Sequence, residues 1–298
     1  MTPFVPEHLS GRDLPTAGWA GLAALAVAGL LLAWWYLRGL VRVRAHAQGR
    51  RRYRWRLAAL VAGVATVLVV TLPPLGDTLD RRLSTHMAQH LALIMVAAPL
   101  IALAAPAPAV LAGMPRALRR RAVSAGRRSP TFGLLTPHVA WALHIGALWL
   151  WHLPAAYDAA VESETVHVAE HAAFLGTAVL FWWHLLTPGR RRLRGPAALF
   201  YVVAAVPPGA ALGAVLTFPE HPLYPAQAAL AAATGVDPML DQRIGGLVMW
   251  IPLDFAYLAL AVVLFARWMQ RLDTAGGAEE SAHQALPPDA RPAVEAPR

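Results

Sequence analysis

Two pairs of histidines are the residues of this sequence best suited to binding a metal ion. His86 and His90 form the first pair, and His167 and His171 form the second. In a helix, residues four apart lie on one face with their Cβ atoms about 6 Å apart, so each pair can offer two imidazole ligands together. Each pair stands at the start of a long apolar run. The spacing therefore predicts two bidentate metal-binding units.

A further histidine is expected at the same depth in the molecule. His152 ends the apolar run that precedes the second pair. If successive runs cross a membrane in alternating directions, all these side chains lie on one side of it. Ionisable groups at membrane depth usually mark functional sites. The sequence therefore predicts one shared metal site made of His86, His90, His152, His167 and His171.

The ligand chemistry favours copper. The chain has no cysteine, which excludes thiolate ligands and leaves zinc, copper and iron as metals that imidazole binds well. Methionines occur near the histidines: Met87 beside the first pair, Met239 in an outer loop and Met249 in the last apolar run. A thioether together with imidazoles favours copper, Cu(I) in particular. Met87 and Met249 are thus additional candidate neighbours of the metal.

A zinc protease is a first alternative. The segment HVAEH (167–171) matches the H-x-x-E-H pattern, in which Glu170 would act as a general base. That site needs a further carboxylate ligand from a later helix. The later carboxylates, Glu220 in a loop and Asp254 deep in the last run, are poorly placed for it, so the sequence does not favour an enzyme.

A di-haem electron carrier is a second alternative. His138 and His152 are 14 residues apart, and His171 and His184 are 13 apart, on runs expected to be antiparallel neighbours. This spacing could hold two haems between paired helices by axial histidine ligation. A third alternative is a metal-free scaffold whose histidines only form hydrogen bonds within a helix bundle.

The composition places the elements that carry these residues in a membrane. The chain has 298 residues, of which 57% are hydrophobic and 14% charged, whereas soluble domains carry about 25% charged residues. A helix needs about 20 apolar residues to span a bilayer. The sequence predicts an all-α, polytopic membrane helical bundle of about seven transmembrane helices. Their expected ranges are 18–37, 55–75, 86–107, 132–153, 165–186, 196–218 and 243–266.

The arginines predict the orientation of this bundle. All 26 basic residues are arginine, and 22 of them lie in segments that seven spans would place on one side: 38–56, 115–128, 189–194 and the tail from Arg267. The positive-inside rule makes this side cytoplasmic. We therefore expect the N-terminus outside, the C-terminus in the cytoplasm and the histidines at the outer face of the cell (inner or plasma) membrane.

This topology divides the chain into three parts. Residues 1–17 are expected to be an extracytoplasmic segment, 18–270 the transmembrane domain and 271–298 a disordered cytoplasmic tail, because the last part is rich in Ala, Pro and acidic residues without periodicity. The arginines are spread over separate short loops, a pattern that indicates anionic lipid headgroups as partners and no nucleic acid.

Three blocks of the sequence resemble a known family. They are HMAQHLALIMVAAPLIALAAP (86–106), LWLWHLPAAYDAAVESETVHVAEHAAFLGTAVLFWW (148–183) and DQRIGGLVMWIP (241–252). Together they are similar to the CtaG family of cytochrome c oxidase assembly proteins, of the seven-helix membrane type. The similarity covers about residues 18–270.

The resemblance implies a function and partners. It implies delivery of copper to a haem–copper oxidase, or another step in maturing its metal centre, at the outer face of the membrane. Oxidase subunits, and other copper chaperones, would then be the partners. It also implies that the same five histidines belong to the site, with Asp241, Met249 and Trp250 near it.

Overall fold

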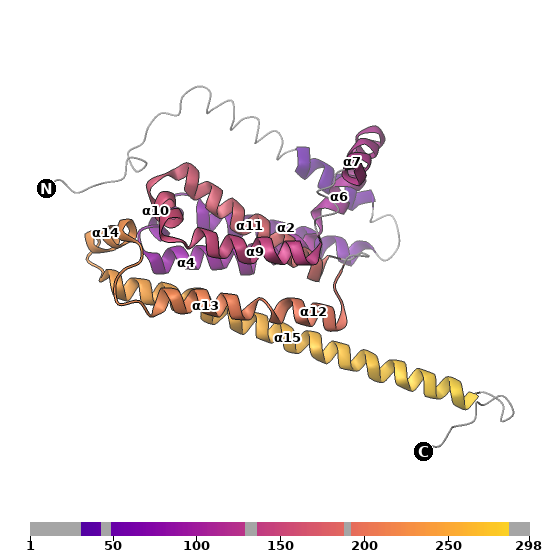
Figure 1. Cartoon of the computed structure of the whole chain (residues 1–298). Helices are drawn as coiled ribbons and strands as arrows, with labels where there is room; N and C mark the ends of the chain where they lie inside the picture. Colours follow the sequence, from indigo (N-terminus) through magenta and orange to yellow (C-terminus); the bar gives the residue numbers. More distant parts are fainter. Residues whose placement is uncertain (1–30, 43–48, 129–135, 188–191, 286–298) are drawn as a thin grey trace, which may run out of the picture.

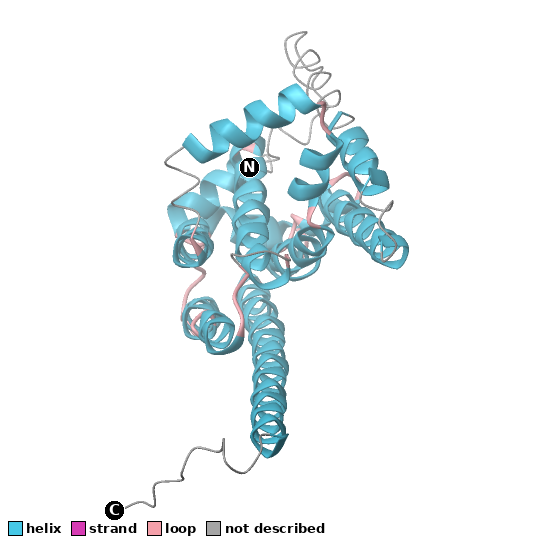
Figure 2. Ribbon diagram, turned by 90° about the vertical axis from the view of Figure 1, so that its right-hand side faces the viewer, coloured by secondary structure: helices cyan, strands magenta, loops and turns pink. Residues whose placement is uncertain are grey.

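The computed structural model describes residues 31–42, 49–128, 136–187 and 192–285, and in these stretches every regular element is a helix. The all-α class is therefore confirmed for the described part of the chain. Figures 1 and 2 show the helices gathered into a bundle, from which the last helix extends well beyond its neighbours. The predicted segment 1–17 lies outside the described residues.

The elements follow one another through short connections. After a helix at 31–42, they are α2 (Gly49–Thr71), α3 (Leu75–Leu79), α4 (Leu83–Ala92), η2 (Leu93–Ala97), α5 (Ala98–Ala104), α6 (Pro106–Gly113), α7 (Arg116–Arg128), α9 (Pro137–Trp151), α10 (Pro154–Glu162), α11 (Glu164–Leu186), α12 (Gly195–Val203), α13 (Val206–Thr217), α14 (Pro225–Ala233) and α15 (Pro238–Ala285).

Four stretches are long and apolar enough to cross a membrane: Arg54–Thr71, Leu83–Gly113, Gly195–Thr217 and Pro238–Thr274. A fifth crossing results if α9 and α10, which meet at 72°, form one broken span. The protein is thus a multi-pass membrane protein with four or five candidate spans among its described residues. Seven spans, the outer N-terminus and the cytoplasmic C-terminus stay predictions, and most of the expected first span, 18–37, lies outside the described residues.

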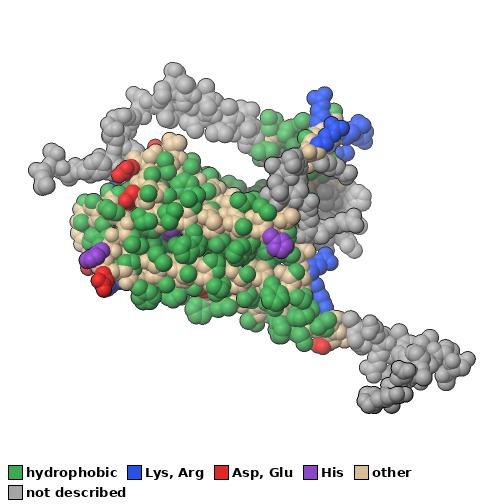
Figure 3. Space-filling view, viewed as in Figure 1, with side chains coloured by type: hydrophobic (Ala, Val, Ile, Leu, Met, Phe, Trp, Pro, Cys, Tyr) green, Lys and Arg blue, Asp and Glu red, His purple; other side chains and the backbone are tan. Residues whose placement is uncertain are grey.

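The outer surface of the bundle suits a lipid environment. Large apolar side chains point outward, among them Trp55, Phe200, Phe218 and Phe255, each more than two-thirds exposed. Figure 3 shows this apolar surface, with arginines around α7 at one end and most of the visible acidic side chains at the other. A soluble protein rarely leaves so much apolar surface uncovered. The separation of charge is the pattern from which the sequence predicts the orientation.

The helix that carries the first histidine pair contains a turn of π-helix. The elements α4, η2 and α5 form one continuous helix over 83–104. The π-helical turn η2 begins three residues after His90. Pro99 has no N–H and cannot donate to the carbonyl four residues earlier, which favours a local change of helix type. In the π-helical pairing, between residues five apart, Pro99 would be the partner of the Ile94 carbonyl and cannot donate to it; this carbonyl accepts a hydrogen bond of 2.9 Å from Trp182 Nε1 of α11. This bond fixes α11 against α4 and η2.

Two consecutive glycines bring α15 close to both α4 and α13. A Cβ atom on Gly245 would lie 3.4 Å from the backbone of Leu83, and one on Gly246 would lie 2.9 Å from the backbone nitrogen of Thr217. Because neither glycine has a side chain, α15 can pack between the two helices. The start of α4 is thereby held against α15.

Helix α15 also corrects the expected extent of the C-terminal tail. It is 48 residues long and continues to Ala285, so residues 271–285, expected to be disordered, are helical. Once a helix is nucleated, adding a residue costs little, and the Ala, Glu and Gln residues of this segment are good helix formers. Residues 286–298 lie outside the described residues.

Candidate metal centre

Four side chains from two packed helices form a compact group of possible metal ligands. His86 and His90 come from α4, and Glu170 and His171 come from α11. One ligand atom of each lies within 4.8 Å of the ligand atoms of the others. The i, i+4 spacing on α4 places its two imidazoles one above the other, with ring centroids 4.3 Å apart. We call these four residues the buried site.

The carboxylate of Glu170 faces both histidines of α4. Its Oε2 lies 3.6 Å from His86 Nε2, and its Oε1 lies 3.6 Å from His90 Nε2. In a tetrahedral site with bonds of about 2.0–2.1 Å, neighbouring ligand atoms are about 3.4 Å apart. The two separations from Glu170 are therefore close to those that a bound ion requires, within a group whose ligand atoms all lie within 4.8 Å of one another.

The buried site leaves several polar atoms without hydrogen bonds. Both oxygens of Glu170, both nitrogens of His90, and Nε2 of His86 and of His171 have no hydrogen-bond partner. Glu170 and His90 are completely buried, and His86 and His171 are 4% and 8% exposed. Buried polar groups are nearly always hydrogen-bonded, and leaving them unpaired is costly. An ion that these atoms coordinate would remove this cost.

A second group of candidate ligands adjoins the first. It consists of Asp80, His86 and His167, which we call the outer site. Asp80 Oδ1 lies 3.0 Å from His86 Nδ1 and 3.6 Å from His167 Nε2. Burial by itself raises the pKa of Asp80, but the hydrogen bond with His86 and the charges that the nearby histidines can carry outweigh it and lower the pKa below its ordinary value. Asp80 is therefore available as an anionic ligand.

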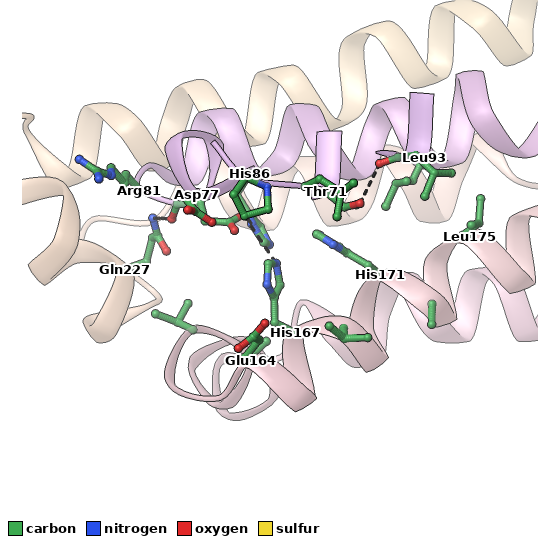
Figure 4. A pocket seen from close by; sticks show the side chains of 18 of the residues that line it. Thr71, Asp77, Arg81, His86, Leu93, Glu164, His167, His171, Leu175 and Gln227 are labelled. Carbon is green, nitrogen blue, oxygen red and sulfur yellow. Dashed lines mark hydrogen bonds and ion pairs between the residues drawn. The ribbon is translucent and has the colours of Figure 1, made fainter. Parts of the chain in front are cut away.

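A cavity of about 650 Å³ adjoins these residues. Its wall includes Asp80, His86, His167 and His171, together with apolar side chains from α2, α10 and α11. Figure 4 shows His86 on one side of this space and His167 and His171 reaching toward it from α11. The histidines are therefore reached from a space larger than a single ion needs.

His152 lies beside the buried site, but its nitrogens face other groups. Its ring centroid is 5.7 Å from that of His90. Its Nδ1 is 2.7 Å from the Leu148 carbonyl oxygen, and its Nε2 is 3.3 Å from Met87 Sδ. The five predicted histidines thus lie in one cluster of rings. His152 and Met87 belong to neither ligand group and instead border the buried site.

Asp241 holds the start of α4. Its carboxylate accepts hydrogen bonds from Leu83 N at 2.7 Å, from Ser84 N at 3.2 Å and from the Ser84 hydroxyl. The first turn of a helix has backbone N–H groups without intrahelical partners, and an acidic side chain there also interacts well with the helix dipole. Asp241, a predicted neighbour of the metal, therefore positions the turn that carries His86.

The remaining predicted neighbours on α15 are part of its packing. Met249 is 1% exposed in the main core cluster, and Trp250 packs over Gly213 of α13. Asp254 Oδ1 has no hydrogen-bond partner, and Nδ1 of the buried His144 lies 3.4 Å from Thr177 Oγ1. Met239, in the first turn of α15, is joined to Asp237 through its backbone N–H.

Two candidate ligands were not singled out from the sequence. The sequence suggests Glu170 only as the general base of the protease alternative, and it gives no reason to choose Asp80. The signal for Glu170 is its position next to His171, because residues 100° apart on α11 can both face a helix as close as α4. Asp80 is six residues before His86, and nothing in this spacing by itself indicates the contact.

The geometry does not favour the di-haem arrangement. His138 is exposed on α9, and both nitrogens of His152, the other haem-ligand candidate from this run, already face protein groups. On α11, His171 instead belongs to the group with His86 and His90. The expected pairing of α9 with α11 is present, since the two helices pack together, but their histidines do not form two stacked axial pairs.

Comparison with known proteins agrees with the resemblance seen in the sequence. The sequence model of the family described as cytochrome c oxidase caa3 assembly factor (Caa3_CtaG) matches residues 34–271. The chain belongs to this family. The match includes all the helices that carry the buried and outer sites. Searches of the curated proteins and of the solved structures found no significant match.

Proposed function

We propose that this caa3 assembly factor binds copper at the buried site, His86, His90, Glu170 and His171, and helps to metallate a haem–copper oxidase. One observation carries the proposal: four ligand atoms converge within 4.8 Å in the protein interior, and most of them have no hydrogen-bond partner. Membership of the oxidase assembly family supplies the link to the oxidase.

The donor set fits copper as a cargo. Three imidazoles suit Cu(I), and the added carboxylate oxygen suits Cu(II), so the same four residues can hold either ion. Zinc and iron also accept this set, and the family's connection with a haem–copper oxidase is the reason for choosing copper. Since no thiolate is present, ligand exchange with a partner's histidines can release the ion again.

The topology predicted from the sequence supports a site from which an oxidase could receive the ion. With seven spans, the N-terminus outside and the C-terminus in the cytoplasm, both histidine pairs begin their helices at the outer face. We further propose that oxidase subunits, and other copper chaperones, dock at this face. The protein then acts as a metal carrier for assembly and not as an enzyme.

Metal analysis tests the proposal. The detergent-purified wild type is compared with a His90→Ala/His171→Ala variant after incubation with copper and removal of the unbound ion. The control is His138→Ala/His221→Ala, which removes two histidines that are exposed and outside both ligand groups. We expect copper in the wild type and the control, its loss in the buried-site variant, and no haem bands in the reduced-minus-oxidised spectrum.

Different results would reject the proposal in different ways. Sharp haem bands would favour the di-haem carrier. If the wild type contains neither copper nor haem, the result would support the third alternative, a metal-free scaffold. The link to the oxidase is tested separately by co-expressing a caa3 oxidase with the wild type or with the buried-site variant. We expect the oxidase from the variant strain to contain less copper and to have lower activity, at an unchanged level of the assembly factor.

A further inference from the structure

The exposure of the ligands decreases from the outer site to the buried site. The side chains of Asp80 and His167 are 34% and 21% exposed, that of His86 is 5% exposed, and those of His90 and Glu170 are completely buried. An ion that enters from outside therefore meets Asp80 and His167 before it can reach His90.

His86 belongs to both sites through different nitrogens. Its Nδ1 lies 3.0 Å from Asp80 Oδ1, and its Nε2 lies 3.6 Å from Glu170 Oε2. The two nitrogens are separated by one ring carbon, and their lone pairs point in different directions. The ring of His86 is also close to both neighbouring rings of α11, with centroids 5.2 Å from His167 and 5.6 Å from His171.

The outer site lines the cavity with all its residues, and the buried site with only part of them. All three outer-site residues line it, whereas His90 and Glu170 of the buried site do not. Around the outer site, the wall also carries Asp77, Glu164 and Arg81, so its charge is mixed (Figure 4). The outer site thus lies between the open space and the two most deeply buried ligands.

We propose that Asp80, His86 and His167 form a second metal site, which receives the incoming ion from the cavity and passes it to the buried site through His86. This inference rests on the proposed function of the buried site. One carboxylate oxygen and two imidazole nitrogens are the ligands that a divalent transition-metal ion such as Cu(II) or Zn(II) prefers.

The transfer is an exchange of ligands. The bonds from the ion to Asp80 and His167 break as bonds to His90, Glu170 and His171 form, and His86 replaces Nδ1 by Nε2 as its bound nitrogen. The ion keeps its oxidation state. Neutral His86 carries its proton on Nε2 while Nδ1 binds the ion, so on transfer Nε2 gives up this proton and Nδ1, which faces Asp80, takes one up; the number of protons on the ring is unchanged. A shared histidine allows this transfer without release of a free hydrated ion inside the protein.

Loading kinetics test the inference. The full chain in detergent is mixed with Cu(II) buffered by glycine, the absorbance of the bound ion is followed by stopped flow, and the final copper content is measured after gel filtration. Asp80→Asn removes a ligand of the outer site. Asp77→Asn is the matched control, because it removes the same charge from the cavity wall outside both ligand groups.

We expect Asp80→Asn to fill the buried site to the wild-type level but roughly tenfold or more slowly, in line with the 10–100-fold by which loss of a group at a metal site weakens binding. Asp77→Asn should load at nearly the wild-type rate. The His90→Ala/His171→Ala variant should still bind Cu(II) weakly, and a further Asp80→Asn change should abolish that binding. His167→Ala gives a second outer-site variant in which the contact between Asp80 and His86 is kept.

Several results would overturn the inference. Wild-type loading rates in both Asp80→Asn and His167→Ala would show that the ion does not pass through an outer site. Equal slowing by Asp77→Asn would assign the effect to charge and not to ligation. Failure of the proposed function looks different: the wild type then holds no tightly bound copper, while the weak binding that depends on Asp80 in the His90→Ala/His171→Ala variant still reports the outer site.

Discussion

Replacing Glu170 by Gln distinguishes the role of this side chain in copper binding from its role in the stability of the fold. Glutamine keeps the shape of the side chain but removes its charge. In the metal-free protein both carboxylate oxygens are buried without a hydrogen bond, at 3.6 Å from the two histidines of α4. Removing one partner of a buried charged pair is destabilising, by about 3–5 kcal/mol where nothing replaces it. The glutamine amide keeps the shape of the side chain and can still form hydrogen bonds with the imidazoles, so we expect the free energy of unfolding of metal-free Glu170→Gln to fall by a smaller amount, about 1–3 kcal/mol.

Copper binding should be weakened in addition to this change in stability. At a copper concentration about 1,000 times its Kd, a bound ion stabilises the wild type by about 4.1 kcal/mol. Loss of a group that only orients a ligand already weakens metal binding by about 10–100-fold, so loss of a ligand should cost about 100-fold or more. At the same copper concentration, the stabilisation of Glu170→Gln should then be about 1.4 kcal/mol or less.

Thermal unfolding in detergent, with and without copper, measures both effects. We expect the rise in Tm caused by copper to be strongly reduced in Glu170→Gln, and the metal-free Tm to fall moderately. Asp254→Asn is the control, because it neutralises another carboxylate with an unpaired oxygen, on α15 and outside both ligand groups. It should keep the full copper effect. The reasoning is refuted if Glu170→Gln lowers the metal-free Tm and leaves the copper-induced rise unchanged.

Three further predictions concern the framework around the site. Gly246→Ala should lower the free energy of unfolding by about 1–3 kcal/mol, because its methyl group would lie 2.9 Å from a backbone nitrogen of α13. Gly146→Ala is the control, since nothing lies within 4 Å of the new Cβ, and its Tm in the same thermal unfolding experiment should be unchanged or slightly higher. Asp241→Ala should remove three hydrogen bonds at the start of α4, speed amide exchange in that turn and weaken copper binding about 10–100-fold; normal affinity with fast exchange would show that the turn need not be held. Because the chain has no cysteine, single cysteines report the topology: an impermeant maleimide added to intact cells should label Glu220→Cys and leave Ser124→Cys unlabelled, and the reverse pattern would invert the predicted orientation.

The sequence by itself determines the class of this protein and the elements that bear the site. Hydropathy and helical spacing are local properties, so they can be evaluated without knowing which helices meet. The apolar runs predicted at 86–107 and 165–186 correspond to α4–η2–α5 and to α11. The i, i+4 pairing of His86 with His90 follows directly from the geometry of one helix.

The C-terminal segment shows where such local reasoning falls short. Its composition indicates disorder from residue 271, but α15 continues to Ala285 because the segment follows a helix that is already formed. Composition describes a segment in isolation, whereas the state of a helix end also depends on what precedes it.

Only the tertiary structure decides which side chains face one another at the site. Helix α11 is apolar around most of its circumference, so its sequence does not specify which face turns toward α4. Packing, including the bond from Trp182 to the Ile94 carbonyl, sets this rotation and turns Glu170 toward both histidines of α4. Asp80 reaches His86 because the chain folds back after α3. Such contacts depend on distances between elements, and spacing along a single chain contains no measure of them.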